Sequence, residues 1–502
     1  MLKILSSRQF KELDQFTIEN EPIAPIDLME RACRAFVDWY VLHFRADKKV
    51  GVVCGPGNNG GDGLGIARML KELGYSVNVW IVKGDLTETE SHKMNLERIQ
   101  GKINIVEIST NPDPGLFGNC NILIDALLGS GLSRPVGGIF AQVISCMNQT
   151  GAIRIAVDIP TGLFADSRSS GEIVIAHQTV TFQLPKLAFL FPENNRWVGK
   201  WHLVDIGLSK GFLKSIPVSN YFVTDKSVKK IIKPRNQFSH KGTYGHALLI
   251  AGSYGKMGAC VLAAMGAMRS GLGLLSVHIP ASGYAIIQTS VPEAMASVDT
   301  SESYFSSAPE NLNYTSIGIG PGLGTNSETV VALAKVLKKF RKPIVIDADA
   351  LNILSLHPEL QQLIPEGSIL TPHPKEFERL AGCWENDFAR LELLRSFSIK
   401  LKSVIVLKGA YTSIACPDGN VYFNSTGNPG MAKGGSGDVL TGILTAIISQ
   451  GYPSKETALL GVYLHGLAGD LAANEFGMDS MIATDLVKMI PKSFKKLHAY
   501  WA

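Results

Sequence analysis

A glycine-rich segment toward the C-terminal end of the chain carries the residue types best suited to phosphoryl chemistry. It reads Gly427-Asn-Pro-Gly-Met-Ala-Lys-Gly-Gly-Ser-Gly-Asp438 and runs into an apolar, helix-like stretch over 439–448. Glycines expose backbone N–H donors at a helix N-terminus, which suits the charge of a transferring phosphoryl group, and Asp438 can take a proton from a substrate hydroxyl. An acidic N-cap would explain Asp438, but not five glycines in the preceding eleven residues. The chain has no GxxxxGK[ST] motif, so a P-loop enzyme is excluded.

A second glycine-rich segment follows an apolar run over 50–54 and reads Gly55-Pro-Gly-Asn-Asn-Gly-Gly-Asp-Gly63. Its first, third and sixth residues match the GxGxxG spacing of dinucleotide-binding loops, and Asp85 could serve as the ribose acid, as in a dehydrogenase. Such a fingerprint alone has no use for two adjacent amides and an acid, which this turn also contains: Asn58, Asn59 and Asp62. The loop therefore indicates a ligand that offers more than phosphate.

Two further carboxylates stand where apolar runs end. Asp125 lies in Ile124-Asp-Ala-Leu-Leu-Gly-Ser-Gly-Leu132, and Asp158 lies in Val157-Asp-Ile-Pro-Thr-Gly162. One such Asp is more often a cap or turn residue, but several at successive strand ends favour a shared ligand site. The segment 130–135 offers another loop for phosphate or ribose.

The elements that must position these residues alternate between short apolar runs and helix-like segments. Helical patterns cover about 6–20 and 25–44, and the apolar runs of the first half lie at 50–54, 76–82, 103–108, 121–126, 154–159 and 179–183. This alternation predicts an α/β fold with a doubly wound, mostly parallel sheet. Ligands are expected at the carboxyl ends of its strands.

A second α/β domain follows a loosened, Gly/Pro/Lys-containing stretch at about 207–240. Its expected strands lie at 247–251, 274–279, 316–320, 343–347, 368–371 and 404–407, followed by a hairpin around Asp418-Gly419 and helices at about 437–450 and 456–475. We place the boundary near 215–225, which gives domains over 1–215 and 225–502.

Composition narrows the setting of the protein. The 502 residues are 45% hydrophobic and 18% charged, and a net charge of +4 without a long Lys/Arg block argues against nucleic acid as a partner. Seven widely spaced cysteines without a CxxC pair indicate reduced thiols and a cytoplasmic protein. The sequence contains no membrane-spanning run and no signal peptide, so no membrane association is expected. We expect a homo-oligomer.

The first half resembles the NAD(P)H-hydrate epimerase family, the YjeF N-terminal domain, over about residues 1–210. The motifs that carry this resemblance are Pro25-Ile-Asp-Leu-Met-Glu30, Asn58-Asn-Gly-Gly-Asp-Gly63, Asp125–Gly131 and Asp158-Ile-Pro-Thr-Gly162. The resemblance implies that the hydrated cofactor is bound by Asn58, Asn59, Gly60, Gly61, Asp62, Gly129, Ser130, Gly131, Leu132, Ser133, Arg134, Pro135 and Asp158. It also implies a potassium ion bound by Asn59, Asp125 and Thr161.

Two positions depart from the family pattern. Thr161 stands where many relatives have Ser, which keeps the hydroxyl oxygen, and Cys33 stands where glycine is common, which we assign to helix packing. The implied chemistry is inversion at the hydroxyl-bearing C6 of the nicotinamide ring. The ring nitrogen can expel a protonated hydroxyl, and water can then attack the planar carbon from the opposite face. Asp158 is the candidate for this proton transfer, provided that burial adjusts its proton affinity, while Lys186 is either a second polar group or a structural residue.

The second half resembles the ribokinase-like fold and, more specifically, the NAD(P)H-hydrate dehydratase family. The matching motifs are Ser239-His-Lys-Gly-Thr-Tyr-Gly-His246, Ala251-Gly-Ser253, Gly320-Pro-Gly-Leu-Gly324, Asp347-Ala-Asp-Ala-Leu-Asn352, Thr371-Pro-His-Pro-Lys-Glu376 and Lys408-Gly409. The resemblance implies that the hydrated cofactor is bound by Ala259, Gly322, His373 and Asp438. It implies that the adenine nucleotide is bound by Lys408, Gly409, Ala410, Tyr411, Thr412 and Gly437.

The resemblance implies a kinase-like step in the service of a dehydration. Once Asp438 helps the substrate hydroxyl to accept a phosphoryl group, the ring nitrogen can expel phosphate and restore NADH or NADPH. The hydrates NADHX and NADPHX are thus the expected substrates, with ADP as co-substrate, giving AMP and phosphate, or else ATP. Magnesium is expected to neutralise the phosphates.

Two other functions are compatible with parts of the chain. A hydroxymethylpyrimidine- or sugar-type kinase with an accessory nucleotide-binding or interaction domain would use the same Asp438 motif, but would release a stable phosphoester. A catalytically silent, partner-binding protein would have no need of the carboxylates at Asp125, Asp158 and Asp438, all of which are present. We therefore favour the repair of hydrated nicotinamide cofactors.

Overall fold

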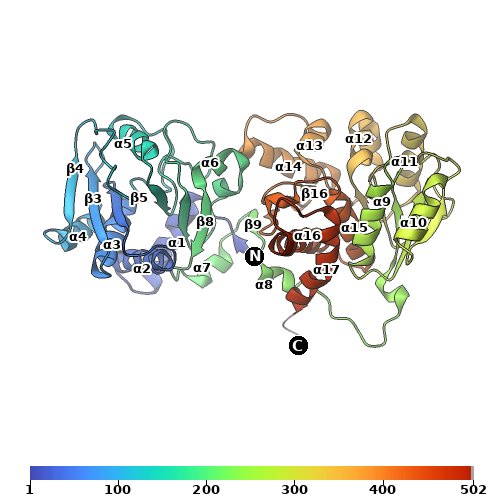
Figure 1. Ribbon diagram of the computed structural model, residues 1–502, viewed down its shortest axis with the longest axis horizontal. Coiled ribbons are helices and arrows are strands. Elements are labelled where there is room, and N and C mark those ends of the chain that lie inside the picture. The colour runs from blue at the N-terminus through green and yellow to red at the C-terminus, as the bar shows by residue number, and fades with distance from the viewer. Residues whose placement is uncertain (499–502) are drawn as a thin grey trace. The chain divides into compact units, whose positions relative to one another are not determined.

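The protein is described by a computed structural model that covers residues 1–498 (Figure 1). The chain divides into two compact units. The first comprises Leu2–Val218 together with Asn386–Phe388, and the second begins at Ser219. Within residues 1–498, no helix combines the length and the apolar composition needed to cross a bilayer.

The first unit alternates strands and helices along the chain. Its elements are β1 (Leu2–Lys3), α1 (Ser7–Asn20), α2 (Pro25–His43), β2 (Lys49–Cys54), α3 (Asn58–Glu72), β3 (Ser76–Val82), α4 (Glu90–Ile99), β4 (Asn104–Ile108), β5 (Ile122–Ala126), α5 (Gly138–Gln149), β6 (Ile153–Val157), β7 (Gln178–Phe182), α6 (Asn195–Val198), β8 (Lys200–Val204) and α7 (Lys210–Ser215).

The sheet of the first unit has the strand order β4-β3-β2-β5-β6-β7-β8, and its neighbouring strands pair in parallel. Its side chains alternate between two cores: Val52 and Cys54 of β2 pack with α2 and α3, whereas Val53 packs with α5 on the other face. Figure 1 shows α5 on one side of the strands and α2 on the other. The expected doubly wound fold is confirmed.

The second unit is a larger α/β structure. Its elements are β9 (Asn220–Phe222), α8 (Asp225–Lys229), β10 (His246–Ile250), α9 (Met257–Met268), β11 (Leu274–Ile279), α10 (Tyr284–Ser290), β12 (Met295–Val298), β13 (Ser316–Ile319), α11 (Ser327–Lys339), β14 (Ile344–Ile346), α12 (Ala348–Leu356), β15 (Ile369–Leu370), α13 (Pro374–Ala381), α14 (Asp387–Leu401), β16 (Val404–Leu407), β17 (Ser413–Ala415), β18 (Val421–Phe423), α15 (Ser436–Ser449), α16 (Ser454–Phe476) and α17 (Ala483–His498).

The strands of the second unit run in the order β9-β18-β17-β16-β15-β14-β13-β10-β11-β12. Pairing is parallel from β16 through β12 and antiparallel in the hairpin β17–β18, whose turn contains Asp418-Gly419 as the sequence predicts. Helices α9 and α15 pack closely, because a Cβ on Gly442 would lie 1.9 Å from the carbonyl oxygen of Ala263. This packing fixes the direction of α15, whose N-terminus carries Asp438.

The structure differs from the expected elements at the start of α3 and at several strands. Helix α3 begins at Asn58, so the polar residues of the first glycine-rich segment lie in its first turns rather than in a loop before it. Glycine and Asn have low helix propensity, so the sequence pattern did not show the start of this helix. A Cβ on Gly60 would lie 1.7 Å from the carbonyl oxygen of Gly55. Strands β1, β8, β9 and β12 were also missed, because β1 and β9 have only two and three residues, and β8 and β12 are edge strands without a run of buried apolar residues.

Candidate active sites

In the first unit, the end of β5 meets the loop after β6 through a buried carboxylate. Asp125 is fully buried, and its two oxygens accept hydrogen bonds from the Thr161 backbone N–H at 2.8 Å and from the Thr161 hydroxyl at 2.6 Å. Burial raises the pKa of Asp125 to about 6, although the hydrogen bonds from Thr161 oppose this shift. The structure therefore brings together two of the three residues expected to bind a cation.

The third residue, Asn59, lies in the first turn of α3 and is 8% exposed. Its Nδ2 is buried and has no hydrogen-bond partner within residues 1–498. A Cβ on Gly129, in the loop after β5, would lie 3.3 Å from the Asn59 Cβ, so α3 and this loop are in contact at that point. A buried N–H donor without a partner is costly, which favours a ligand that offers a hydrogen-bond acceptor at this position.

Asp158 follows β6 and has a left-handed backbone, with φ of 64°. Its Oδ1 accepts hydrogen bonds from the backbone N–H of Phe182 at 3.0 Å, from the Thr181 hydroxyl at 3.2 Å and from the Lys186 ammonium group. The Lys186 side chain is only 3% exposed. Three donors converge on one oxygen and leave Oδ2 for a ligand, and backbone strain of this kind is concentrated at functional positions.

The other residues expected to bind the hydrated cofactor in this unit line the same region. Asn58, Gly60, Gly61 and Asp62 lie in the first turns of α3 with Asn59, and Gly129–Pro135 forms the loop after β5. Asp62 stands near Asp158, and burial followed by the Asp158 charge raises its pKa well above the usual range. Asn58, Gly131 and Ser133–Pro135 are exposed to solvent.

In the second unit, Asp438 is the third residue of α15, and the preceding Gly435 has a left-handed φ of 90°. Burial raises the pKa of Asp438 to about 7; the Asp347 charge adds to the shift, and Lys408 opposes it. A carboxyl group that titrates near neutral pH can serve as a general base there. Its position among backbone N–H groups at a helix N-terminus matches the sequence expectation.

Lys408 directly follows β16 and lies next to the N-terminus of α15. Its Nζ donates to Asp347 Oδ1 at 2.8 Å, and the other Asp347 oxygen accepts from the Thr441 hydroxyl at 2.7 Å. A Cβ on Gly437 would lie 3.5 Å from the Lys408 Nζ and 3.7 Å from Asp347 Oδ2. The family resemblance implied that Lys408 and Gly437 both bind the nucleotide, and the structure places the two residues close together.

The ion-pair network of Lys408 extends to His373. The Lys408 Nζ lies 3.9 Å from Glu376, and the Glu376 carboxylate in turn accepts from the His373 backbone N–H at 2.8 Å. The His373 Nδ1 accepts from the Glu376 N–H at 3.2 Å and so caps α13. Partial burial lowers the pKa of His373, and its side chain is 46% exposed.

Two further residues expected to bind the hydrated cofactor, Gly322 and Ala259, lie close together near the start of α9. A Cβ on Gly322, which has a left-handed φ of 67°, would lie 3.4 Å from the Ala259 Cβ. The Ser253 hydroxyl donates to the Gly322 carbonyl at 2.7 Å and connects the Ala251–Ser253 motif to this turn. The remaining nucleotide positions, Gly409, Ala410, Tyr411 and Thr412, form the turn between β16 and β17, where Thr412 Oγ1 donates to the Gly409 carbonyl at 2.8 Å.

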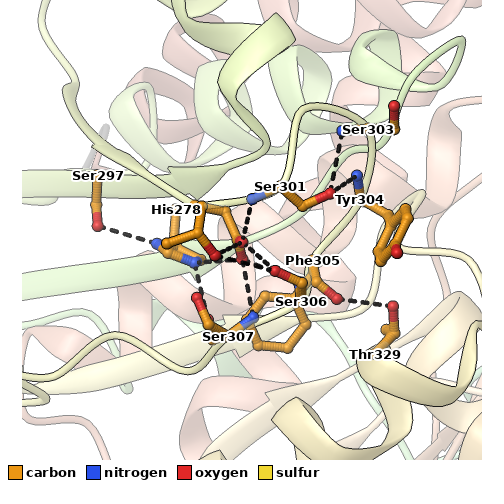
Figure 2. Close-up of polar contacts among 11 residues, drawn as sticks. His278, Ser297, Ser301, Ser303, Tyr304, Phe305, Ser306, Ser307 and Thr329 are labelled. Atoms are coloured by element: carbon orange, nitrogen blue, oxygen red, sulfur yellow. Dashed lines mark hydrogen bonds and ion pairs between the residues drawn. The ribbon is translucent and has the colours of Figure 1, made fainter.

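The loop after β12 is held by a polar cluster that sequence reasoning missed (Figure 2). Asp299 accepts five hydrogen bonds from this loop, among them 2.9 Å from the Ser301 N–H and 3.1 Å from the Ser307 N–H, and His278 Nε2 lies 3.2 Å from it. These bonds hold the pKa of Asp299 down to about 2 although burial opposes them. The loop then accepts from the Tyr254 N–H through the Ser303 carbonyl, at 2.7 Å, beside the Ala251–Ser253 motif.

Comparisons with known proteins match both halves of the chain. The NAD(P)H-hydrate dehydratase family model matches residues 247–492, and the model described as YjeF-related protein N-terminus matches residues 25–188. The bifunctional NAD(P)H-hydrate repair enzyme of Moorella thermoacetica is 34% identical over 98% of this chain and 97% of the relative. The chain belongs to this family. The Escherichia coli member is also 34% identical, over 88% of this chain and 84% of the relative.

Solved structures resemble the second unit. The ADP/ATP-dependent NAD(P)H-hydrate dehydratase from Bacillus subtilis, co-crystallised with ATP and Mg²⁺, is 36% identical with a TM-score of 0.50, over 55% of this chain and 98% of that chain. A ribokinase-like superfamily protein from Enterococcus faecalis is 29% identical with a TM-score of 0.51, over 56% and 96%. The expected ribokinase-like fold of the second domain is confirmed.

Proposed function

We propose that the protein repairs hydrated nicotinamide cofactors, with an epimerase domain over 1–215 and a dehydratase domain over 225–502. The first domain interconverts R- and S-NAD(P)HX, and the second returns S-NAD(P)HX to NAD(P)H at the expense of ADP, giving AMP and phosphate. The observation that carries this proposal is the placement of Asp438, with a pKa of about 7, at a helix N-terminus above the Lys408–Asp347 pair. This arrangement can take a hydroxyl proton and stabilise a phosphoryl group in transfer to the hydroxyl oxygen at the same place.

In the dehydratase step, Asp438 takes the proton of the C6 hydroxyl as its oxygen attacks the terminal phosphorus of the nucleotide. The leaving nucleotide departs one phosphate shorter. The ring nitrogen then pushes its electron pair toward C6, the C–O bond to phosphate breaks, and loss of a proton from the neighbouring carbon restores the ring double bond. Lys408 and the N–H groups of Gly437 and its neighbours stabilise the transferring charge.

The remaining proposed ligand contacts are those that the family resemblance implies. Ala259, Gly322, His373 and Asp438 bind the hydrated cofactor, and Lys408–Thr412 with Gly437 bind the nucleotide. Magnesium would accompany the nucleotide and neutralise its phosphates. The B. subtilis relative crystallised with ATP and Mg²⁺ supports this part of the proposal.

In the epimerase domain, Asp158 moves a proton at the C6 hydroxyl while Lys186 holds its Oδ1. The hydrated cofactor is bound between the first turns of α3, residues 58–62, and the loop 129–135. Asn59, Asp125 and Thr161 would hold a potassium ion, and they fit one: all three offer oxygen donors, and the buried Asp125 carboxylate has hydrogen bonds but no cationic partner within residues 1–498. The ion would supply positive charge that orders the loop after β5.

The proposal also covers the compartment, the oligomeric state and the co-substrate of the protein. We place it in the cytoplasm as a homo-oligomer, and all seven cysteines are unpaired, as a reducing compartment requires. ADP is the proposed co-substrate. NADHX and NADPHX are its small-molecule substrates.

Product analysis distinguishes this function from that of a small-molecule kinase. Purified protein is incubated with S-NADHX and ADP, and inorganic phosphate, AMP and NADH are measured together. Repair predicts that the three products accumulate in equal amounts. A stable phosphoester of the hydrate, formed without NADH, would show a kinase instead.

A further inference from the structure

Helix α1 lies against the epimerase site, although the matching family model begins only at residue 25. The Ser7 hydroxyl donates to the Ser130 carbonyl at 2.9 Å, which joins the start of α1 to the loop after β5. A Cβ on Gly131 of that loop would lie 3.8 Å from the Lys11 Nζ. The N-terminal turns of α1 therefore form one wall of the region that we assign to the hydrated cofactor.

The same face of α1 reaches the Asp158–Lys186 pair. The Lys186 Nζ lies 4.6 Å from the centre of the Phe10 ring. Asp14 follows Phe10 by four residues, so both side chains project from one face of the helix. Positions 7, 10, 11 and 14 thus turn toward the site, while Glu12, with its side chain 46% exposed, points to solvent and pairs with Arg8.

Asp14 has the features of a reactive carboxyl group and not those of a structural one. Within residues 1–498 its carboxyl group makes no hydrogen bond or ion pair, although the residue is partly buried. Burial raises the pKa of Asp14 to about 6, the Asp158 charge adds to this shift, and Lys186 opposes it. The Asp14 charge is also among the causes that raise the pKa of Asp62 on α3.

We propose that Asp14 is the second proton-transfer residue of the epimerase, acting with Asp158. This inference rests on the proposed epimerase function. Inversion at C6 removes a hydroxyl from one face of the ring and adds water to the other, so it needs an acid and a base in different places. Asp158 is held by Lys186, Thr181 and Phe182 in a form suited to the base, whereas Asp14, without such donors, supplies the acid.

The step balances without any redox change. Asp14 gives its proton to the C6 hydroxyl, the C–O bond breaks, water leaves, and the nitrogen electron pair forms an N–C6 double bond. A water molecule then bonds to the opposite face of C6, its proton passes to Asp158, and the electron pair returns to nitrogen. In the reverse direction the two carboxyl groups exchange roles, and bulk water resets their protons.

Asp14→Asn tests this assignment in the full-length protein. Conversion of R- to S-NADHX is followed at a pH where the spontaneous exchange is slow, and consumption of added S-NADHX with ADP serves as the internal check on the second domain. We expect kcat for epimerisation to fall by about a hundredfold or more with KM little changed, and S-form consumption to stay normal. Asp14→Glu should recover part of this loss, because it restores an acid.

Glu12→Gln, on the exposed face of the same helix, is the matched control and should epimerise at the parental rate. An Asp14→Asn protein within tenfold of the parent would overturn the proposal. So would equal losses in the Asn and Glu variants, since these would indicate a packing role. If the parent itself shows no epimerisation above background, the proposed function fails, which is a different result from failure of Asp14.

Discussion

Asp438 and Asp158 have the same side chain but different surroundings, and the surroundings set their roles. Asp438 is shielded at a helix N-terminus near the Asp347 charge, so its pKa rises to about 7. Asp158 is instead paired with the buried Lys186. The first arrangement suits a base that must exchange protons near neutral pH, and the second holds a carboxylate in a fixed direction.

We predict that Asp438→Asn lowers dehydration by a factor of about a hundred to ten thousand, because the hydroxyl loses its proton acceptor. Recovery of NADH from S-NADHX with ADP is the measurement, and exchange between the two epimers should be unchanged. Asp418→Asn, in the exposed turn between β17 and β18, is the control and should recover NADH normally. A loss below tenfold in the Asp438 variant would contradict the general-base role.

The rate of dehydration should also depend on pH in a defined direction. Burial raises the pKa of Asp438 to about 7, so the base form is scarce at pH 6 and dominant at pH 8. The value of kcat/KM for S-NADHX should therefore rise through about pH 7 and level off above it. A rate that is flat or falls between pH 6 and pH 8 would be inconsistent with Asp438 as the base.

Asp158→Asn should separate the epimers. The variant should consume S-NADHX with ADP at the parental rate, while R-NADHX persists at the rate of spontaneous exchange. Asp113→Asn, in the exposed loop after β4, provides the control in the same domain. If the Asp158 variant consumed R-NADHX as fast as the parent, Asp158 would have no part in proton transfer.

The end of an apolar run and the glycine-rich segment indicated Asp158 and Asp438 as candidates from sequence, and the family resemblance implied Lys408; their roles remain predictions. The hydrogen-bond partners of these residues could not be predicted from sequence. Asp347 is 61 positions from Lys408, and Thr441 lies 94 positions from Asp347, so only the folded sheet brings them together. Asp14 carries no motif at all, and only the packing of α1 reveals it.

At the scale of elements, the periodicity predicted the central strands of both sheets, since buried parallel strands are short, apolar and bounded by turns, but it missed the edge strands β8 and β12. The periodicity did not predict the start of α3, where residues of low helix propensity form the first turns. The first turns of α3 are helical although they contain Asn and Gly, which favour loops, and Gly60 is required there because the backbone approaches residue 55 too closely for a side chain. Residues at this helix start therefore serve the site at the expense of the local pattern.

Gly60→Ala tests this account of α3. Its Cβ would lie 1.7 Å from the Gly55 carbonyl oxygen, so the turn must shift, at a cost of about 1–3 kcal/mol. Thermal unfolding of the first domain should move down by several degrees, and epimerisation should fall with it. Gly57→Ala is the matched control, because no atom lies within 4 Å of its Cβ and its φ is −84°. Equal unfolding temperatures for the two variants would refute the close approach.

At the scale of the whole molecule, two α/β units carry one carboxylate-centred site each. The sequence showed the change of pattern between them, but the exact strand at which the second unit begins, β9, was too short to predict. The two proposed reactions are linked by the S epimer: the first unit makes it from the R form, and the second unit consumes it. We therefore infer that the two units act one after the other on the same substrate.

Absorbance of the reduced nicotinamide ring follows the combined action of the two units. The parent protein is given purified R-NADHX with ADP and Mg²⁺ under conditions of slow spontaneous epimerisation, and the recovery of NADH is followed to completion. We predict that all of the R form returns as NADH, faster than spontaneous exchange allows and only when ADP is present. Recovery limited to the spontaneous rate would contradict the epimerase, and the absence of NADH even from S-NADHX would contradict the dehydratase.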